Sequence, residues 1–241
     1  MVKRKARFVA QDTTMTGTVE GGLLVAEGRE YDPDTVTFLA PTEPTKIVCV
    51  GLNYRDHAEE SQLPLPEEPL LFLKPPSALV GHHGSIRLPT QSSRVEYEGE
   101  LAVVIRAPCS RVPEQTALDY VAGYTILNDV TARDIQLRES QWTRAKGFDT
   151  FAPCGPWLVE GIDASDLSIE TLLNGEVRQS SSTRQLIFPV PQIVSYISSV
   201  MTLEPGDIIA TGTPAGVGIM RPGDTVEVRI EGIGSLINVA A

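Results

Sequence analysis

Val95-Glu-Tyr-Glu-Gly-Glu-Leu-Ala-Val-Val-Ile105 is a stretch that becomes continuously apolar directly after two carboxylates, Glu98 and Glu100. The apolar run predicts a β-strand over residues 101–105. Side chains two positions apart in a strand point to the same face, so the two carboxylates are predicted to converge. Such a pair needs a counter-ion, and a hard divalent cation such as Mg²⁺ or Mn²⁺ takes carboxylate oxygens as ligands. A strand end whose acids are solvated is the alternative.

The composition around this stretch is that of a globular protein. The chain has 241 residues, of which 41% are hydrophobic and 21% charged, enough for one substantial domain with its own core and a small appendage. The formal net charge of −11 predicts neither nucleic acid nor an anionic membrane surface as a partner. A small anionic ligand would need local cations, which a metal or a placed Lys or Arg can supply.

The cellular setting is also predicted from the sequence. The basic first residues lead into Gln11 and Asp12 without a long apolar run, which predicts no secretory signal, and no segment is apolar enough to span a membrane. Cys49, Cys109 and Cys154 are odd in number and far apart, which argues against a disulfide framework and a zinc knuckle. We therefore expect a cytoplasmic protein.

Secondary structure is predicted to be rich in strands. Residues 1–45 predict a small N-terminal β domain, and residues 46–241 a larger second domain. In the second domain we expect a buried strand over residues 46–51, a loop over residues 62–69 that can act as a lid, and helical structure over residues 129–145. Many strands without regular βαβ alternation favour an α+β, β-rich fold. The other predicted features are strands over 6–10, 17–20, 23–26 and 70–73, a linker over 41–45, and type II turns at Pro205-Gly206 and Pro222-Gly223.

A third carboxylate, Asp129, is the natural partner of Glu98 and Glu100, although an acid at the start of a helix is also a common N-terminal cap. Three carboxylates around one Mg²⁺ would leave a negative charge, so an anionic substrate would need a further cation, from Lys146 or Arg133. Lys146 can equally be a solvated lysine at a helix end. Residues Asp129, Arg133 and Gln136 are spaced to share one helical face.

Two further candidates carry acid–base or anion-binding chemistry. Asn53 is a plausible cap for a short helix on which His57 and Glu60, three residues apart, share a face, so the carboxylate can orient the imidazole as a general base. A surface histidine among acids is the alternative. The glycine-rich run 212–218 lacks a phosphate-loop signature, and is either a tight turn or a loop in which Thr213 donates to a bound carboxylate.

The sequence resembles the fumarylacetoacetate hydrolase family over residues 46 to about 240, with several motifs in the same order along the chain. The motifs that carry the resemblance are Val50-Gly-Leu-Asn-Tyr-Arg-Asp-His57, Leu71-Phe-Leu-Lys-Pro75, Tyr97-Glu-Gly-Glu-Leu101, Asn128-Asp-Val-Thr-Ala-Arg-Asp134, Lys146-Gly-Phe-Asp149 and Gly206-Asp-Ile-Ile-Ala-Thr-Gly-Thr-Pro-Ala-Gly-Val-Gly218. The resemblance implies a mixed β-roll with a small N-terminal β domain, and a homodimer.

The resemblance also implies roles for single residues. Glu98, Glu100 and Asp129 would hold a metal, usually Mg²⁺ and sometimes Mn²⁺ or Ca²⁺. The other implied roles are catalysis by Lys146 and by a His57–Glu60 dyad on a lid helix, and substrate contacts by Thr213, with Arg133 and Gln136 as further substrate-binding candidates.

The expected activity is that of a Mg²⁺-dependent enzyme acting on a 2-oxo acid through a metal-bound enolate, most simply the hydrolytic C–C cleavage of an acylpyruvate. Decarboxylation of oxaloacetate and isomerisation of 2-hydroxyhepta-2,4-diene-1,7-dioate share that enolate and stay open as alternatives. The non-enzymatic alternative is a catalytically idle metal-binding protein that senses a 2-oxo acid.

Overall fold

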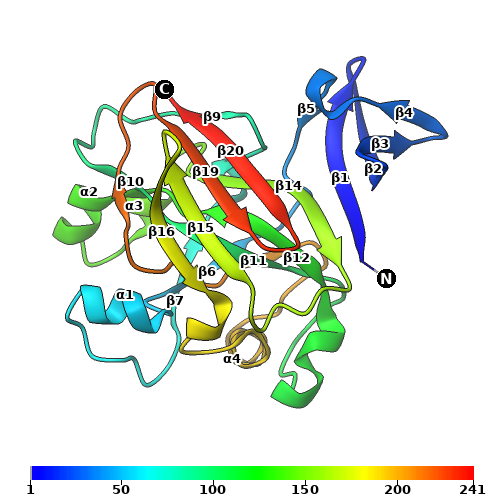
Figure 1. Ribbon diagram of the computed structural model, residues 1–241. Helices are drawn as coiled ribbons and strands as arrows, with labels where there is room; N and C mark the ends of the chain where they lie inside the picture. Colours follow the sequence, from blue (N-terminus) through cyan, green and yellow to red (C-terminus); the bar gives the residue numbers. More distant parts are fainter. Residues whose placement is uncertain (1) are drawn as a thin grey trace.

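The structure of this chain is a computed structural model that describes residues 2–241, and its fold is dominated by strands (Figure 1). In chain order the strands are β1 (Lys3–Ala10), β2 (Thr13–Glu20), β3 (Leu23–Ala26), β4 (Arg29–Tyr31), β5 (Thr37–Phe38), β6 (Ile47–Gly51), β7 (Leu70–Lys74), β8 (Leu79–Val80), β9 (Ser85–Ile86), β10 (Val95–Tyr97), β11 (Gly99–Ile105), β12 (Val121–Asn128), β13 (Thr131–Ala132), β14 (Ala152–Glu160), β15 (Ser168–Leu173), β16 (Glu176–Ser182), β17 (Ile208–Ala210), β18 (Gly218–Ile219), β19 (Thr225–Ile230) and β20 (Gly234–Ala240).

Helices are short and few by comparison. The α-helices are α1 (Arg55–Glu60), α2 (Arg133–Arg138), α3 (Thr143–Lys146) and α4 (Val190–Val200), and 3₁₀ turns cover Pro33–Thr35, Pro76–Ala78, Glu114–Tyr120 and Thr183–Gln185. Within residues 2–241, none of these helices has the length and apolar character needed to cross a bilayer. The predicted α+β, β-rich fold class is confirmed.

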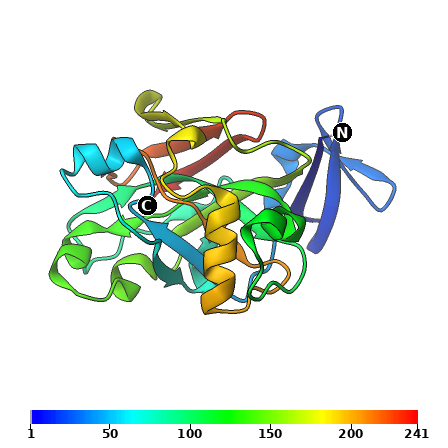
Figure 2. The same cartoon turned by 90° about the horizontal axis from the view of Figure 1, so that it is seen from below.

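Three sheets organise the strands, and the two larger ones are mixed. The largest has 12 strands in the order β4-β3-β2-β1-β14-β12-β11-β17-β6-β7, with β5 paired to β1 and β8 to β14. A 5-stranded sheet runs β16-β15-β19-β20-β9, and a 3-stranded one β13-β10-β18. Most pairs are antiparallel, whereas β6–β17, β8–β14 and β9–β20 are parallel. In Figures 1 and 2, α1 and α2 lie on the side of the molecule opposite to β1–β4.

The continuous apolar run of β11 is explained by burial of both faces of the strand. Leu101, Val103 and Ile105 belong to the main core, which also contains Ile193 and Ile197 of α4 and residues of β15 and β19. The alternate residues Ala102 and Val104 belong to a second cluster with residues of β6, β14 and β17. β11 is therefore a central strand between two apolar layers, and its N-terminal end is held rigidly.

The N-terminal strands β1–β5 have an apolar cluster of their own, formed by Phe8, Leu24 and Phe38 with neighbouring alanines. They connect to the rest of the sheet through the antiparallel pairing of β1 with β14. The strands predicted before residue 27 are confirmed, while the division of the chain into domains after residue 45 stays a prediction.

Both predicted Pro-Gly turns are present. Gly206 and Gly223 have φ values of +88° and +90°, and in each turn the fourth residue donates its N–H to the carbonyl of the first, Asp207 to Glu204 at 3.0 Å and Asp224 to Arg221 at 3.0 Å. All three cysteines are buried and free, in agreement with the absence of a predicted disulfide framework.

Two predictions of local structure are wrong. The expected helix over residues 129–145 is two short helices, α2 and α3, separated by residues 139–142, and Asp129 lies outside both. Asn53 does not cap α1, because Tyr54 is the N-cap residue. The Asn53 amide instead accepts from the N–H of Phe188 at 2.8 Å and donates to the carbonyls of Phe188 and Thr211.

Candidate functional site

Three buried carboxylates meet where β11 begins and β12 ends. Glu98 lies in the break between β10 and β11, Glu100 is the second residue of β11, and Asp129 directly follows β12. Antiparallel pairing of Gly99 with Asn128 brings these ends together, and the Asp129 N–H donates to the Glu98 carbonyl at 2.8 Å. One carboxylate oxygen from each of the three residues lies within 4.8 Å of the others. The predicted convergence of the three acids is present.

Two buried lysines contact this carboxylate cluster. Lys146 donates from Nζ to Glu98 Oε2 at 2.8 Å and to Asp129 Oδ2 at 2.6 Å. Lys74, the last residue of β7, donates to Asp129 Oδ1 at 2.5 Å and to the Val130 carbonyl at 3.0 Å. Burial alone would lower the pKa of Lys146, but Asp129 and Glu98 outweigh it and raise that pKa. Lys146 is thus a fixed cation at the cluster, as we predicted for its position.

Arg133 adds a third cation from α2. Its Nε donates to Glu96 Oε2 at 2.6 Å, its Nη1 donates to Gln136 Oε1 at 2.5 Å, and its Nη2 is ion-paired with Glu98. The other oxygen of Glu96 accepts from Arg94 Nε at 2.6 Å. Burial would raise the pKa of Glu98, but Lys146 and Arg133 outweigh burial and lower it to about 2. Glu98 is therefore a carboxylate anion at neutral pH.

Glu100 is the member of the cluster whose charge is left uncompensated. Its Oε2 accepts from the Gly212 N–H at 2.7 Å, and within residues 2–241 no ion pair reaches it. Burial, followed by the charges of Asp129 and Glu98, raises its pKa well above the usual value. A buried anion of this kind is costly unless a positive charge is supplied. The donor set, three carboxylates with one lacking a cationic partner, fits a hard divalent cation.

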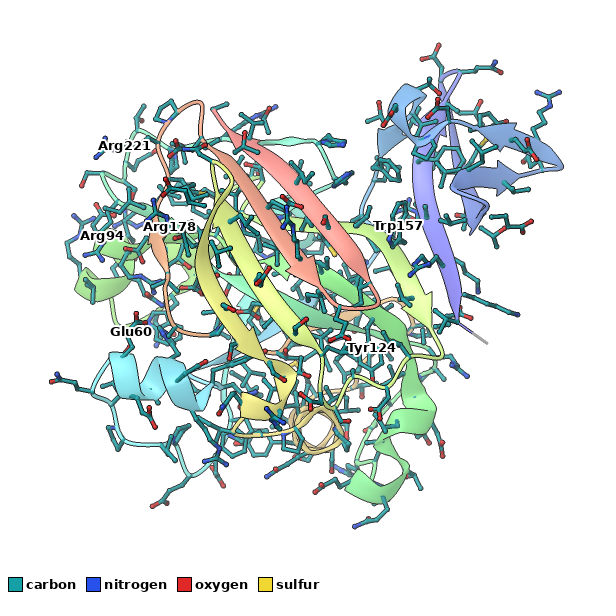
Figure 3. All side chains as sticks on the ribbon, in the orientation of Figure 1. Glu60, Arg94, Tyr124, Trp157, Arg178 and Arg221 are labelled. Atoms are coloured by element: carbon teal, nitrogen blue, oxygen red, sulfur yellow. The ribbon has the colours of Figure 1, made fainter. Side chains whose placement is uncertain are left out.

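His57 and Glu60 occupy one turn of α1 beside the same cavity. His57 Nδ1 lies 3.3 Å from Glu60 Oε2, and the imidazole lines the cavity wall. The two Glu60 oxygens accept from the N–H of Gly216 at 3.1 and 3.2 Å, which ties α1 to the glycine-rich loop. Figure 3 shows Glu60 and Arg94 on the side of the molecule where α1 and α2 lie. Glu60 can hold the imidazole by one ring nitrogen and leave the other toward the cavity.

Thr213 also lines the cavity, but its hydroxyl already has protein partners. It donates to the Gly99 carbonyl at 3.0 Å and accepts from Gln179 Nε2 at 2.8 Å. A substrate contact through this hydroxyl would have to displace the bond to Gly99. The substrate roles of Thr213, Arg133 and Gln136 therefore stay predictions, although all three residues line one cavity.

The cavity has a volume of about 400 Å³ and is lined by all the predicted site residues except Glu60. Its lining also includes residues that were not predicted from the sequence, among them Phe72, Arg94, Glu96, Leu137 and Trp142. Lys74, behind Asp129, was missed as well. Its signals in the sequence are its place in the motif Leu71-Phe-Leu-Lys-Pro75 and its position at the end of the apolar strand 70–73, directly before two prolines.

Comparison with known proteins identifies close relatives of the whole chain. The family described as fumarylacetoacetate (FAA) hydrolase C-terminal matches residues 46–240. An uncharacterised protein of Archaeoglobus fulgidus is 58% identical over 236 residues, which cover 97% of this chain and 94% of the relative. A mitochondrial oxaloacetate tautomerase of Bos taurus is 46% identical over 216 residues, covering 84% of this chain and 69% of the relative.

A solved structure has the same fold throughout. The crystal structure of a 2-hydroxyhepta-2,4-diene-1,7-dioate isomerase from Mycobacterium marinum superposes with a TM-score of 0.92 at 45% sequence identity. The match covers 99% of this chain and 98% of that one, so it includes the N-terminal strands that carried no distinctive sequence motif.

Proposed function

This chain belongs to the fumarylacetoacetate hydrolase family, and from that membership we propose that it is a divalent-cation-dependent enzyme moving a proton between the enol and keto forms of a small 2-oxo acid. The observation that carries the proposal is a single cavity that holds the carboxylate cluster and the His57 imidazole. Within residues 2–241 this cluster is the one group of carboxylate, His or Cys ligands close enough to hold a metal ion.

Glu98, Glu100 and Asp129 are the residues that would hold the cation, with Mg²⁺ as first choice and Mn²⁺ or Ca²⁺ as alternatives. A cation bound there supplies Lewis-acid stabilisation of negative charge on the 2-oxo oxygen. It also compensates the charge of Glu100, which otherwise has a backbone N–H as its partner. The global negative charge of the protein is thereby overcome locally for an anionic substrate.

Arg133 and Lys146 are the protein's own means of binding the substrate anion. The Arg133 guanidinium has donors beyond the three that its acidic and amide partners use. Lys146 lines the same cavity and keeps its proton, so its ammonium can stabilise charge that develops on the 2-oxo oxygen.

His57 is the group proposed to move the proton. In the direction of the keto form, His57 as imidazolium gives its proton to C3 and becomes neutral imidazole. The 2-hydroxyl loses its proton to water, and the imidazole takes up a proton from water before the next turnover, so atoms and charges balance without a co-substrate. Glu60 at 3.3 Å keeps Nδ1 oriented and stabilises the imidazolium that forms in the opposite direction.

The named relatives support proton transfer over bond cleavage. Tautomerisation of oxaloacetate and isomerisation of a 2-hydroxydienedioate both shift a proton and a double bond while every carbon–carbon bond stays intact. Both reactions need one acid–base group close to a site for an enolate, and His57 supports this assignment because it lines the same cavity as the carboxylate cluster.

Hydrolytic cleavage of an acylpyruvate, the activity first expected from the sequence, is the second candidate. It is supported by the same His57–Glu60 pair, which can take a proton from a water molecule that attacks the distal carbonyl. The bond between C3 and the attacked carbon then breaks, and its electron pair passes to C3. Decarboxylation of oxaloacetate would use the same electron acceptor without water.

Turnover assays distinguish these reactions. The purified protein is incubated with Mg²⁺, and then with EDTA, together with enol-oxaloacetate, 2-hydroxyhepta-2,4-diene-1,7-dioate or acetylpyruvate. We expect cation-dependent acceleration of the enol-to-keto conversion. Release of acetate from acetylpyruvate would establish the second candidate, and binding without any turnover would establish the sensor. Light scattering of the same samples tests the predicted homodimer.

A further inference from the structure

The lining of the cavity combines two kinds of residue. The carboxylate cluster and the cations that contact it supply charged groups. The lining also includes apolar side chains, although the chemistry proposed above requires no apolar surface. Among these side chains are Leu52, Leu63, Phe72, Leu137, Trp142 and Val217.

Two of the apolar residues, Phe72 and Trp142, form an aromatic surface beside Lys146. The rings of Phe72 and Trp142 contact edge to face, with centroids 5.2 Å apart, and Lys146 Nζ lies 4.9 Å from the centroid of Phe72. Trp142 is held closely against β6, because a Cβ on Gly51 would lie 3.1 Å from the Trp142 ring. Phe72 therefore lies beside Lys146, the cation proposed to stabilise the 2-oxo oxygen, and Trp142 extends the aromatic surface.

Leu63 and Leu137 are apolar side chains that line the cavity and are exposed to water. Leu63 comes from the segment after α1 and is 53% exposed, and Leu137 comes from α2 and is 74% exposed. An apolar group of a ligand that covers them would remove apolar surface from water, which favours binding.

The cations of the cavity are already ion-paired among the described residues. Arg94 is paired with Glu96, Arg133 with Glu96 and Glu98, and Lys146 with Glu98 and Asp129. Arg133 and Lys146 are proposed to bind the 2-oxo end of the substrate, so Arg94, which is paired with Glu96, is the remaining Lys or Arg of the lining for a second carboxylate at the far end. The volume of about 400 Å³ also lies within the range of about 300 to 1,000 Å³ that holds drug-sized ligands, so it has room beyond a four-carbon acid.

From these observations we infer that the substrate is a 2-oxo acid whose distal part is apolar, an alkyl or aryl group that lies against Phe72 and Trp142 and covers Leu63 and Leu137. The inference rests on the proposed function for the chemistry at the 2-oxo end. It assigns Leu137 and Trp142 as residues that determine specificity.

The test compares phenylpyruvate with oxaloacetate in the Mg²⁺-dependent conversion of enol to keto forms. We expect kcat/KM for phenylpyruvate to exceed that for oxaloacetate by about tenfold or more, the discrimination that one or two apolar contacts provide. Leu137→Asn, which is polar but uncharged, should lower the phenylpyruvate value about tenfold and lower the oxaloacetate value less, because oxaloacetate has no apolar group to lie against this side chain. Because Leu137 is exposed, the variant is expected to fold.

A matched control is Leu118→Asn, in the 3₁₀ turn Glu114–Tyr120, where the leucine is 50% exposed and does not line the cavity. It should leave both values unchanged. Leu137→Lys should shift preference toward oxaloacetate, because it adds a cation that can pair with the second carboxylate of that substrate. A wild-type preference for oxaloacetate, or equal effects of Leu137→Asn on both substrates, would overturn the inference while the proposed function stands.

Binding of ligands that cannot react distinguishes failure of the inferred apolar subsite from failure of the proposed function. Phenyllactate and malate have the shapes of the two substrates but lack the 2-oxo group, and isothermal titration measures their affinity for the Mg²⁺-loaded protein. If neither 2-oxo acid is turned over, the proposed function fails, and tighter binding of phenyllactate than of malate, lost in Leu137→Asn, still supports the apolar subsite. Equal or tighter binding of malate overturns it.

Discussion

Lys74 Nζ and Asp129 Oδ1 lie 2.5 Å apart, and both side chains are buried. The other oxygen of Asp129 accepts from Lys146, so this acid is held between two ammonium groups. Burial lowers the pKa of Lys74, and the charge of Asp129 only partly offsets that effect. Lys74 lies behind the acid and does not line the cavity, which makes it a positioning residue for Asp129.

We predict that Lys74→Met lowers the free energy of unfolding by about 3 kcal/mol, the lower end of the range for removing one partner of a buried ion pair, because Asp129 keeps its bond to Lys146. Part of the loss should be recovered in Mg²⁺, because a bound cation compensates Asp129. Urea denaturation in EDTA and in Mg²⁺ measures both effects. Arg184→Met is the control, because its pair with Asp166 is exposed and should contribute little. An unchanged midpoint for Lys74→Met would contradict the prediction.

A second prediction separates Glu100 from its neighbour Glu96, which is also a buried acid of the cavity. Glu100→Gln should weaken Mg²⁺ binding by at least about 100-fold, a loss larger than that of an outer residue of a metal site. In EDTA the same variant should be no less stable than the wild type, because it removes a buried charge that lacks a cationic partner. Titration calorimetry and urea denaturation check the two parts.

Glu96→Gln is the matched control for that experiment. Glu96 is ion-paired with Arg94 and Arg133 and lies outside the carboxylate cluster. Its loss should leave Mg²⁺ affinity close to that of the wild type and weaken substrate binding through Arg133. Equal losses of Mg²⁺ affinity in the two variants would remove the distinction between ligand and neighbour.

The third prediction concerns His57. Replacement by Gln should lower turnover by about 10² to 10⁴, the usual contribution of a general acid–base group, and leave Mg²⁺ affinity unchanged. Glu60→Gln should cause a smaller loss, since an amide oxygen can still accept from the Gly216 N–H but cannot stabilise an imidazolium. Steady-state kinetics and calorimetry on both variants test this order. Loss of metal affinity in His57→Gln would contradict the assignment.

The convergence of Glu98 and Glu100 could be predicted from sequence because it depends on the two-residue period of a strand. It survives even though the strand is broken at Glu98. Asp129 was expected to lie at the start of a helix, where an N-terminal cap was the alternative role. No helix begins there, and the acid reaches the cluster because β12 pairs with β11. Pairing between strands depends on contacts distant in sequence, which local patterns do not contain.

Other features of the site were not predicted because they depend on tertiary contacts. Lys74 belongs to a type of residue that is almost always exposed, so its burial could not be expected from its own position. The amide of Asn53 bonds to residues 135 and 158 positions away, which makes it part of the tertiary core and not a helix cap. Leu137 and Trp142 were expected to lie within one continuous helix. The structure instead has a break at residues 139–142 between α2 and α3, and both side chains line the cavity.

The last prediction concerns stability at acid pH and depends on His82, which lies in a loop between the N-terminal strands and the rest of the molecule. Its Nδ1 accepts from the Ile237 N–H at 3.0 Å, and its ring contacts Phe38 edge to face at 5.4 Å. Burial, and to a smaller degree His83, lowers the pKa of His82 to about 4, while Glu227 acts in the opposite direction.

The unfolded chain binds a proton at this residue near pH 6.5, and the folded chain only near pH 4. The contribution of neutral His82 to stability is therefore complete above pH 6.5 and is lost as the pH falls toward 4. His82→Asn keeps the acceptor for Ile237 and cannot titrate. Its free energy of unfolding should change less over this interval than that of the wild type, by about 1 to 2 kcal/mol after allowance for partial exposure. Urea denaturation at each pH measures this difference. His83→Asn, at the exposed neighbour, should retain most of the wild-type slope, and an equal slope in His82→Asn would show that other groups control acid stability.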